Sequence, residues 1–255
     1  MNPSVSSRYT RIGIDRIIRL KWLEQTAYLA LAGQKAPAIK TILQKELQPE
    51  FPGSNSNVRG SLNKTITILM RVWVRPSEEF SCLQQDGLEL IATLPREYHI
   101  IVHWGMIMAV YPFWSTVASY VGRLLGLQGR VVARQIQRRM REHYGERETV
   151  SRAVQRVLRS FIDWGVLKET SSKGVYTQGM SQDIKSLKLI AWLVEAFLHA
   201  QPEKKSVLRA ILNATSLFPF HLSLVSGDQL AGVFERLQVV RHDLDQDLIM
   251  LGRVS

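Results

Sequence analysis

Residues Ile100 to Gly122, IIVHWGMIMAVYPFWSTVASYVG, contain no Asp, Glu, Lys or Arg. A run of this length and composition is long enough to cross a bilayer, but it also suits buried helices. Pro112 lies in its middle, where it would break a membrane-spanning helix, and His103 is one of several polar residues in the run. Because proline suits the first position of a helix, we expect two buried helices that meet at Tyr111 and Pro112, and no membrane association.

Apolar spacing along the rest of the chain is typical mainly of helices. Before this run, helices are expected over residues 14–31, 37–47, 61–74 and 77–92. After residue 180, two more are expected over 182–200 and 202–215, followed by a strand at 220–225, a short helix at 227–236 and a hairpin formed by 238–242 and 248–252. Residues 1–10 are expected to be a flexible tail.

The chain is basic, and its charge is concentrated in one segment. Its 33 Lys and Arg against 22 Asp and Glu give a net charge of +11, with a pI near 10.0. Arg123 to Lys173 hold twelve basic and five acidic residues, a net charge of +7 in one fifth of the chain. Charge of this sign and density favours a polyanionic partner.

Two amphipathic helices are expected within this basic segment. The first spans Val131 to Tyr144 and ends at Gly145, and the second is capped by Thr149 and ends at Gly165. The inner face of the second is expected to consist of Val150, Val154, Val157, Leu158 and Phe161. Arginines recur at helical spacing on the outer faces: Arg130, Arg134, Arg138 and Arg141 on the first helix, and Arg152, Arg156 and Arg159 on the second. A short hairpin follows, with Lys173 at its tip.

This segment, GRVVARQIQRRMREHYGERETVSRAVQRVLRSFIDWGVLKETSSKGVYT, resembles the winged helix-turn-helix superfamily. The resemblance implies that the second helix enters a DNA groove while the hairpin touches the backbone. The expected DNA-binding residues are Arg130, Arg134, Arg138, Arg141, Thr149, Arg152, Arg156, Arg159 and Lys173. Three other interpretations remain open: solvated helix faces, a winged helix that docks protein, and RNA binding.

The sequence offers no support for catalysis. It contains no phosphate-binding glycine loop and no nucleophile-elbow motif. His99 and His103 have a spacing that can bind zinc, but Ile100 stands where the general-base glutamate of such a motif would be, so we expect packed core histidines. The single cysteine, Cys82, excludes an internal disulfide and indicates a reducing cytoplasm. We therefore expect no enzyme, no cofactor, no metal and no small-molecule substrate.

A second resemblance covers more of the chain and concerns its layout. The segments LEQTAYLALAG, LELIATLPREYHIIVHWGMIMAVYPFWSTVASYVGRLL and RAVQRVLRSFIDWGVLKE resemble the BrxA family of BREX phage-defence systems. This resemblance implies a small, helical, non-catalytic DNA-binding subunit that works with other defence-system proteins in the cytoplasm. The alternatives are a protein-interaction scaffold of a multi-subunit complex and a winged-helix transcriptional regulator.

The expected fold class is mainly α. It comprises a helical N-terminal bundle over 11–111, a central winged helix-turn-helix over 112–179 and a small α+β C-terminal region over 180–255, with duplex DNA as the expected partner.

Overall fold

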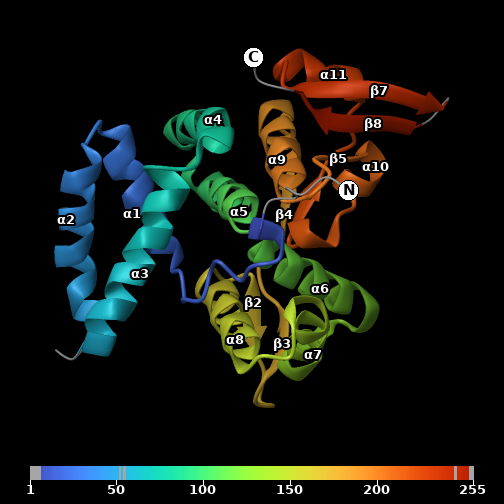
Figure 1. The fold of residues 1–255 in the computed structure, drawn as a ribbon. Coiled ribbons are helices and arrows are strands. Elements are labelled where there is room, and N and C mark those ends of the chain that lie inside the picture. The colour runs from blue at the N-terminus through green and yellow to red at the C-terminus, as the bar shows by residue number, and fades with distance from the viewer. Residues whose placement is uncertain (1–6, 52, 54–55, 244–245, 253–255) are drawn as a thin grey trace.

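The computed structural model describes residues 7–51, 53, 56–243 and 246–252. The helices are α1 Leu20–Leu31, α2 Ala36–Leu47, α3 Ser56–Trp73, α4 Ser81–Thr93, α5 His99–Val110, α6 Pro112–Gln128, α7 Ala133–Tyr144, α8 Glu148–Asp163, α9 Leu187–His199, α10 Leu208–Leu212 and α11 Gly227–Val233. The strands are β1 Arg130–Val132, β2 Leu167–Glu169, β3 Val175–Gln178, β4 Gln182–Ile184, β5 Lys205–Val207, β6 Phe220–Leu222, β7 Leu237–Asp243 and β8 Gln246–Leu251. The mainly α prediction is confirmed (Figure 1).

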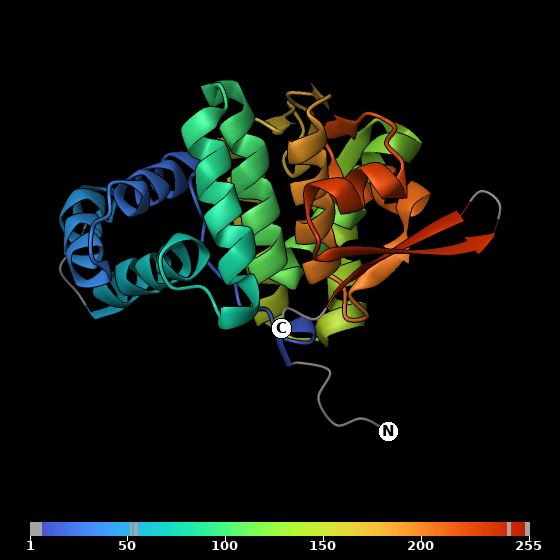
Figure 2. The ribbon, with the colours of Figure 1, turned by 90° about the horizontal axis from the view of Figure 1, so that it is seen from above.

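Outside α6 to β3, the elements form three parts side by side, and α6, α7, α8, β2 and β3 lie below them in the view of Figure 1. Helices α1, α2 and α3 lie on one side, α4 and α5 lie in the middle, and α9 with the C-terminal strands lies on the other side (Figure 2). Helix α1 packs against α3 and α5, which attaches the first part to the centre.

The centre of the molecule is the pair α5 and α9. Residues 99–109 of α5 and 189–199 of α9 are buried, and the two helices pack against each other. Helix α5 ends at Val110 and α6 begins at Pro112, so the prediction of two helices meeting at this proline is confirmed.

Within the described residues, no single helix is long and apolar enough to span a membrane. Residues 96–110 and 112–128 meet that test only together, as a pair bent by 119°.

An aromatic cluster joins this centre to the basic segment. Trp104 of α5 lies 5.5 Å from Trp114 of α6 and 4.9 Å from Phe161 of α8, measured between ring centroids. The rings of Phe218 and Phe220 from the C-terminal part also contact Trp104, at 5.4 and 5.7 Å. The three regions expected from sequence therefore share one continuous hydrophobic core.

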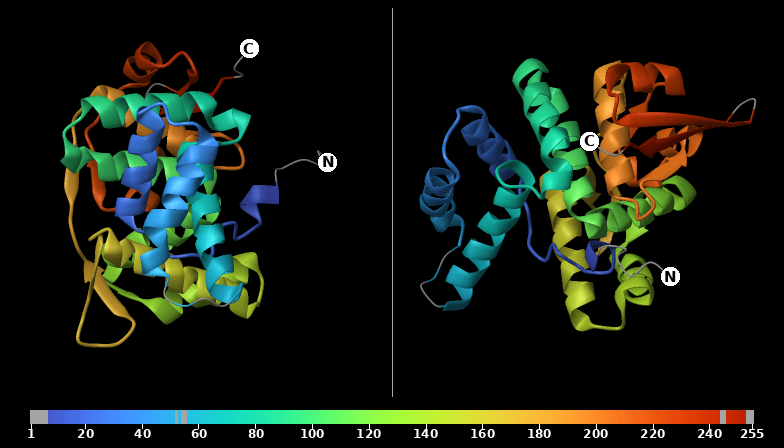
Figure 3. Two further views of the ribbon diagram at one scale, coloured as in Figure 1. Left: turned by 90° about the vertical axis from the view of Figure 1, so that its left-hand side faces the viewer. Right: turned by 45° about the horizontal axis from the view of Figure 1, so that its top comes forward.

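The basic segment folds as helix, strand, helix, helix, strand and strand, from α6 to β3. Strand β3 lies between β1 and β2 and is antiparallel to both, with Val131 opposite Tyr176 and Leu167 opposite Gln178. The turn between β2 and β3 projects from the body of the molecule (Figure 3). Gly174 in this turn has a φ of 78°, a conformation that glycine adopts without a steric penalty.

The N-terminal segment differs from its prediction. Residues 14–31 were expected to be one helix, but α1 begins only at Leu20, and the residues before it run extended beside α8 (Figure 1). The backbone amide of Ile18 donates to the Ser160 hydroxyl at 2.9 Å, and the Ile18 carbonyl accepts from the Trp164 indole at 2.8 Å. Since α8 satisfies these backbone groups, the segment does not need helical hydrogen bonds.

Part of the expected N-terminal tail is also structured. Its first six residues lie outside the described residues, whereas Ser7–Tyr9 form a 3-10 helix. Arg8 holds this turn in place by donating to the Ala109 carbonyl at 2.7 Å.

Two expected helices in the C-terminal part contain strands instead. Residues 182–184 form β4, parallel to β6, and the helix expected at 182 begins at Leu187. Residues 205–207 form β5, which pairs with β8, so the helix expected from 202 is reduced to α10. The hairpin expected near the C-terminus is confirmed as β7 and β8.

Candidate nucleic-acid interface

Helices α7 and α8 pack against each other, and both bury the apolar faces expected of them. The buried residues of α7 are Ile136, Met140 and Tyr144. In α8 the whole predicted inner stripe is buried: Val150, Val154, Val157, Leu158 and Phe161. This packing directs the arginines of α8 away from the core, as the helical spacing requires.

Arg152 and Arg159 lie on the exposed side of α8. Arg152 donates to Glu148, one turn earlier in the same helix, at 2.6 Å. Arg159 lies 3.4 Å from Glu169 of β2. The side chains of both arginines are 60% exposed. Exposed ion pairs of this kind contribute little to stability, so both guanidinium groups can exchange a carboxylate for a phosphate at low cost.

Arg156 has a different environment from its two neighbours in the stripe. It donates a hydrogen bond of 2.5 Å to the backbone carbonyl of Asp15 in the N-terminal segment. Partial burial and the nearby charge of Arg16 lower the pKa of Arg156 below the ordinary arginine value. Arg156 therefore holds the N-terminal segment against α8, a role that the helical spacing does not reveal.

Lys173 is exposed in the turn between β2 and β3, as expected. Between this turn and α8 lies a groove of about 670 Å³, lined among others by Gln155, Arg156, Arg159 and Lys173. Ile17 of the N-terminal segment closes one side of it. We call Arg152, Gln155, Arg159 and Lys173 the α8–hairpin surface.

The four arginines expected on the first helix do not share one helix. Arg130 lies in β1, because the chain pairs with β3 up to Val132 and α7 begins at Ala133. Val131 is fully buried in this sheet, which explains why a β-branched pair precedes the helix. The predicted start of this helix at Val131 is therefore wrong by two residues.

The remaining arginines of α7 point in different directions. Arg134 is exposed, and Arg138 lies 3.9 Å from Glu142. Arg141 turns toward the start of α8, where it lies 2.9 Å from Glu146 and donates to Ser151.

Thr149 does not cap α8. The helix begins at Glu148 with Arg147 as the capping residue, and the side chain of Arg147 makes no capping hydrogen bond. Thr149 lies in the first turn and is exposed. Its predicted role as a cap is therefore wrong, although it still lies at the end of α8 that faces solvent.

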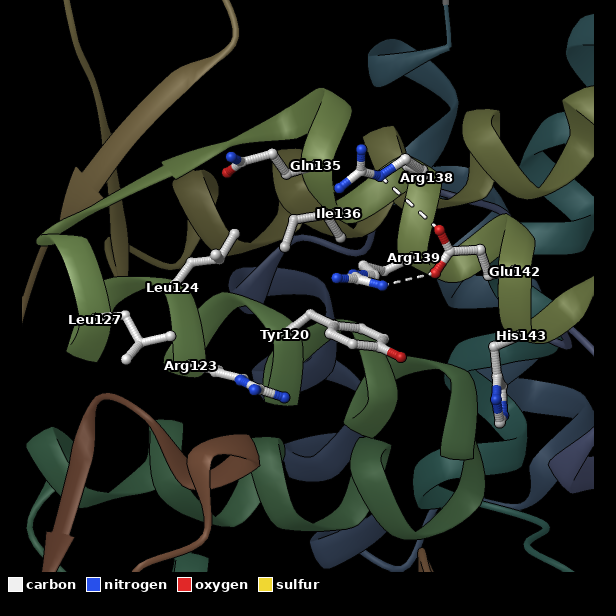
Figure 4. Close-up of a pocket in the computed structure, with 10 residues that line it drawn as sticks. All are labelled: Tyr120, Arg123, Leu124, Leu127, Gln135, Ile136, Arg138, Arg139, Glu142 and His143. Atoms are coloured by element: carbon white, nitrogen blue, oxygen red, sulfur yellow. Dashed lines mark hydrogen bonds and ion pairs between the residues drawn. The ribbon is translucent and has the colours of Figure 1, made fainter.

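A second groove, of about 520 Å³, lies between α6 and α7 (Figure 4). Leu124, Leu127 and Tyr120 of α6 line one wall, while Arg138 and Arg139 of α7 line the other. The side chain of Glu142 lies between these two arginines, and Leu127 is 73% exposed. No feature of the sequence singled out this groove, since its residues come from two helices whose packing was unknown.

The two histidines with zinc-like spacing are packed in the core, as expected. The ring nitrogens of His99 contact the Tyr28 hydroxyl at 3.2 Å and the Leu94 carbonyl at 3.0 Å. His103 accepts a hydrogen bond from the Trp73 indole at 3.1 Å. Across the described part of the chain, no group of three or more His, Cys, Asp or Glu residues is placed to hold a metal ion.

Comparison with known proteins yields no relative. No family model matches the chain, and neither the curated proteins nor the solved structures include a match.

Proposed function

We propose that residues 112–179 form a winged helix and that this protein binds duplex DNA through the α8–hairpin surface. The observation that carries the proposal is the order of the helices and strands in residues 112–179. The order helix, strand, helix, helix, strand, strand from α6 to β3, with β3 in the centre of a three-stranded sheet, is the order expected of a winged helix and supports the proposal. In such domains the second helix of the helix-turn-helix lies in the major groove.

The charges on this surface support the same proposal. Arg152 and Arg159 are exposed on α8, and Lys173 extends the positive charge onto the projecting turn. The N-terminal segment makes its hydrogen bonds to α8 at Arg156, Ser160 and Trp164, which lie after the first two turns of the helix. We infer that these first turns enter the groove while Lys173 contacts a phosphate.

Fluorescence anisotropy with a labelled duplex, measured at two or more salt concentrations, tests the proposal. If about five phosphates are neutralised, the logarithm of the association constant falls with the logarithm of the salt concentration with a slope of about −4 to −5. The double variant Arg152→Gln/Arg159→Gln should make that slope less steep by about 2 and weaken binding about tenfold at ~150 mM salt.

Arg209→Gln is the control, because it removes one positive charge, half of what the double variant removes, from an exposed position on α10 away from the basic segment. It should bind DNA with nearly wild-type affinity. A double variant that bound duplex as tightly as the wild-type protein would rule out α8 as the contact.

The wider role that we propose is a non-catalytic DNA-binding subunit of a prokaryotic phage-defence system. Its support is the resemblance of layout to the BrxA family together with the basic surface described above. In a host that carries the complete system, the double variant should lose protection against phage, measured as plating efficiency, whereas Arg209→Gln should keep it.

A protein-interaction scaffold is the second candidate function, and the groove between α6 and α7 favours it. An exposed leucine beside several arginines suits an acidic, partly apolar partner segment. In this case Leu127→Glu should abolish co-purification with the partner subunit and leave DNA affinity unchanged.

A further inference from the structure

A third cavity, of about 510 Å³, lies apart from the α8–hairpin surface. It is open to solvent and lies between the N-terminal segment, the C-terminal end of α3 with the residues after it, and the junction of α5 with α6. Its basic and polar lining includes Arg8, Arg11, Arg71, Arg75, Ser77 and Tyr111. Four arginines around one cavity form an anion-attracting site, because each keeps its charge at every physiological pH.

Three of these arginines are available to a ligand. Arg11, Arg71 and Arg75 are exposed, and no carboxylate among the described residues lies within ion-pair distance of them. By contrast, the exposed Arg152 and Arg159 of α8 both have a glutamate partner.

The remaining charges in the cavity wall compensate one another. Arg8 lies 3.8 Å from Glu79, and Lys204 donates to the same carboxylate at 2.9 Å. Burial opposes ionisation of Glu79, but the hydrogen bond from Lys204 and the charge of Arg8 hold the pKa of Glu79 below its ordinary value. Glu79 is the one acidic residue among the described lining residues, and it is already paired with Arg8 and Lys204, so these residues keep a net positive charge.

Tyr111 supplies the second, independent sign of a ligand. Its side chain is only 5% exposed, and its hydroxyl has no hydrogen-bond acceptor among the described residues, since the neighbouring Arg71 can only donate to it. Burial raises the pKa of Tyr111 to about 12, and the neighbouring Arg71 offsets part of that rise. The hydroxyl is therefore protonated at neutral pH and is a donor without an acceptor, an arrangement that is rare in buried positions.

The backbone around Tyr111 shapes the same cavity. Gly13 has a φ of 62°, and a Cβ atom at this position would lie 3.2 Å from the Tyr111 ring. Glycine suits this position, because a side chain here would be strained at this φ and would crowd the ring. Pro112, the first residue of the 17-residue helix α6, also lines the cavity, so the positive end of that helix adds to the field of the arginines.

We propose that this cavity binds a phosphate group, with Tyr111 donating to one phosphate oxygen and Arg71 and Arg75 pairing with the others. Guanidinium groups match the geometry of phosphate oxygens and bind them bidentately. The volume is within the range of small-molecule sites and exceeds that of phosphate alone. Phe80 and Val110 in the wall offer apolar contacts to the remainder of a phosphate ester. The proposal does not depend on the α8–hairpin surface.

Isothermal titration calorimetry of the full chain at constant ionic strength tests the proposal. The ligands are inorganic phosphate, adenosine 5′-monophosphate and, as the probe without a phosphate, adenosine. Wild-type protein should bind the phosphate-bearing probes saturably and adenosine not at all. The affinity should fall at least tenfold in Arg71→Gln/Arg75→Gln and about threefold or more in Tyr111→Phe, which keeps the ring and removes only the hydroxyl.

The control is Arg59→Gln, an exposed arginine on the same helix but outside the cavity, which should bind like the wild-type protein. A parallel titration with duplex DNA separates two sources of the phosphate. If the DNA backbone supplies the phosphate, Arg71→Gln/Arg75→Gln also weakens duplex binding and makes the salt slope less steep. If a free phosphate ester supplies the phosphate, Arg71→Gln/Arg75→Gln binds duplex DNA with the same affinity as Arg59→Gln.

The proposal is overturned if the double variant and Tyr111→Phe match Arg59→Gln with every probe. This outcome is independent of the α8–hairpin surface, since Arg152→Gln/Arg159→Gln leaves the cavity intact and should bind inorganic phosphate normally.

Discussion

His103 lies in the middle of α5 with none of its side chain exposed. Its Nδ1 atom accepts the hydrogen bond from Trp73, so the proton of the neutral ring is on Nε2, which has no partner among the described residues. Burial, helped by the nearby His99, lowers the pKa of His103 to about 3. In the unfolded chain the same group has a pKa near 6.5.

This difference in pKa makes the stability depend on pH. Between about pH 6.5 and 3 the unfolded chain binds a proton that the folded protein does not, so the free energy of unfolding falls as the pH falls through this window. At pH 4.5 the loss due to His103 amounts to about 3 kcal/mol relative to pH 7.

We predict that His103→Asn makes the protein less sensitive to acid. Asparagine does not titrate in this window, and its side-chain oxygen can still accept from the Trp73 indole. Urea unfolding at pH 7 and pH 4.5 should show that the difference between the two free energies shrinks by about 3 kcal/mol in the variant. His143→Asn removes an exposed histidine from α7 and is the control. Equal differences in His103→Asn and wild type would contradict the prediction.

At the scale of elements, the crossing of α5 and α9 depends on a residue without a side chain. A Cβ atom on Gly105 would lie 2.4 Å from the Trp192 ring and 3.0 Å from Leu193. Trp192 is fully buried, and its indole donates to the Leu83 carbonyl at 2.9 Å, so the ring cannot move away without losing that hydrogen bond.

We predict that Gly105→Ala destabilises the protein by about 1–3 kcal/mol, because it overpacks this crossing. Gly126 in α6 provides the opposite case, since no atom would lie within 4 Å of its added Cβ. Gly126→Ala should stabilise the protein by about 0.5–1 kcal/mol, because alanine favours the helix. Thermal unfolding of the two variants should shift the midpoint in opposite directions, and shifts of the same sign would refute this account of the crossing.

The sequence predicts some elements better than others, for a physical reason. Local patterns identified several features: a proline at a helix start predicted α2 and the break at Pro112, and apolar spacing predicted the buried inner stripe of α8. Strands β1, β4 and β5 were missed, because each has three residues and pairs with a strand distant in the chain. In all three the sequence predicted a helix, and so short a strand shows little alternating pattern to oppose that prediction. Strand β6 is equally short but was expected as part of a strand over 220–225.

In the candidate site too, the sequence predicts what a local pattern determines and misses what distant segments determine. The exposure of Arg152 and Arg159 follows from helical spacing within α8, and the structure agrees. The contact of Arg156 with the Asp15 carbonyl joins residues 141 positions apart. The cavity beside Tyr111 likewise draws its arginines from the N-terminal segment, from α3 and from the residues just after α3. No local pattern predicts either arrangement, since both depend on how distant segments pack.

At the scale of the whole molecule, one ionic network connects the C-terminal sheet to the centre. Arg236, just before β7, contacts Glu195 of α9 at 3.0 and 2.9 Å and also pairs with Asp86 of α4. Glu195 is 1% exposed. Burial opposes the ionisation of Glu195, but His199 and Arg236 hold the pKa of Glu195 below its ordinary value. Burial also opposes the charge of Arg236, but Glu195 and Asp86 raise the pKa of Arg236 above its ordinary value. Removal of the arginine would leave a buried carboxylate without this partner.

We predict that Arg236→Met destabilises the whole protein by about 3–5 kcal/mol, as is typical when one partner of a buried ion pair is removed. Arg241→Met is the control, because Arg241 pairs with Asp228 while both side chains are more than 70% exposed, and it should change stability by less than ~0.5 kcal/mol. Urea unfolding followed both by tryptophan fluorescence and by circular dichroism measures the loss. Because one core joins all parts of the chain, the two signals should change together in Arg236→Met. A transition seen by circular dichroism before the buried tryptophans respond would mean that the C-terminal sheet unfolds separately from the centre.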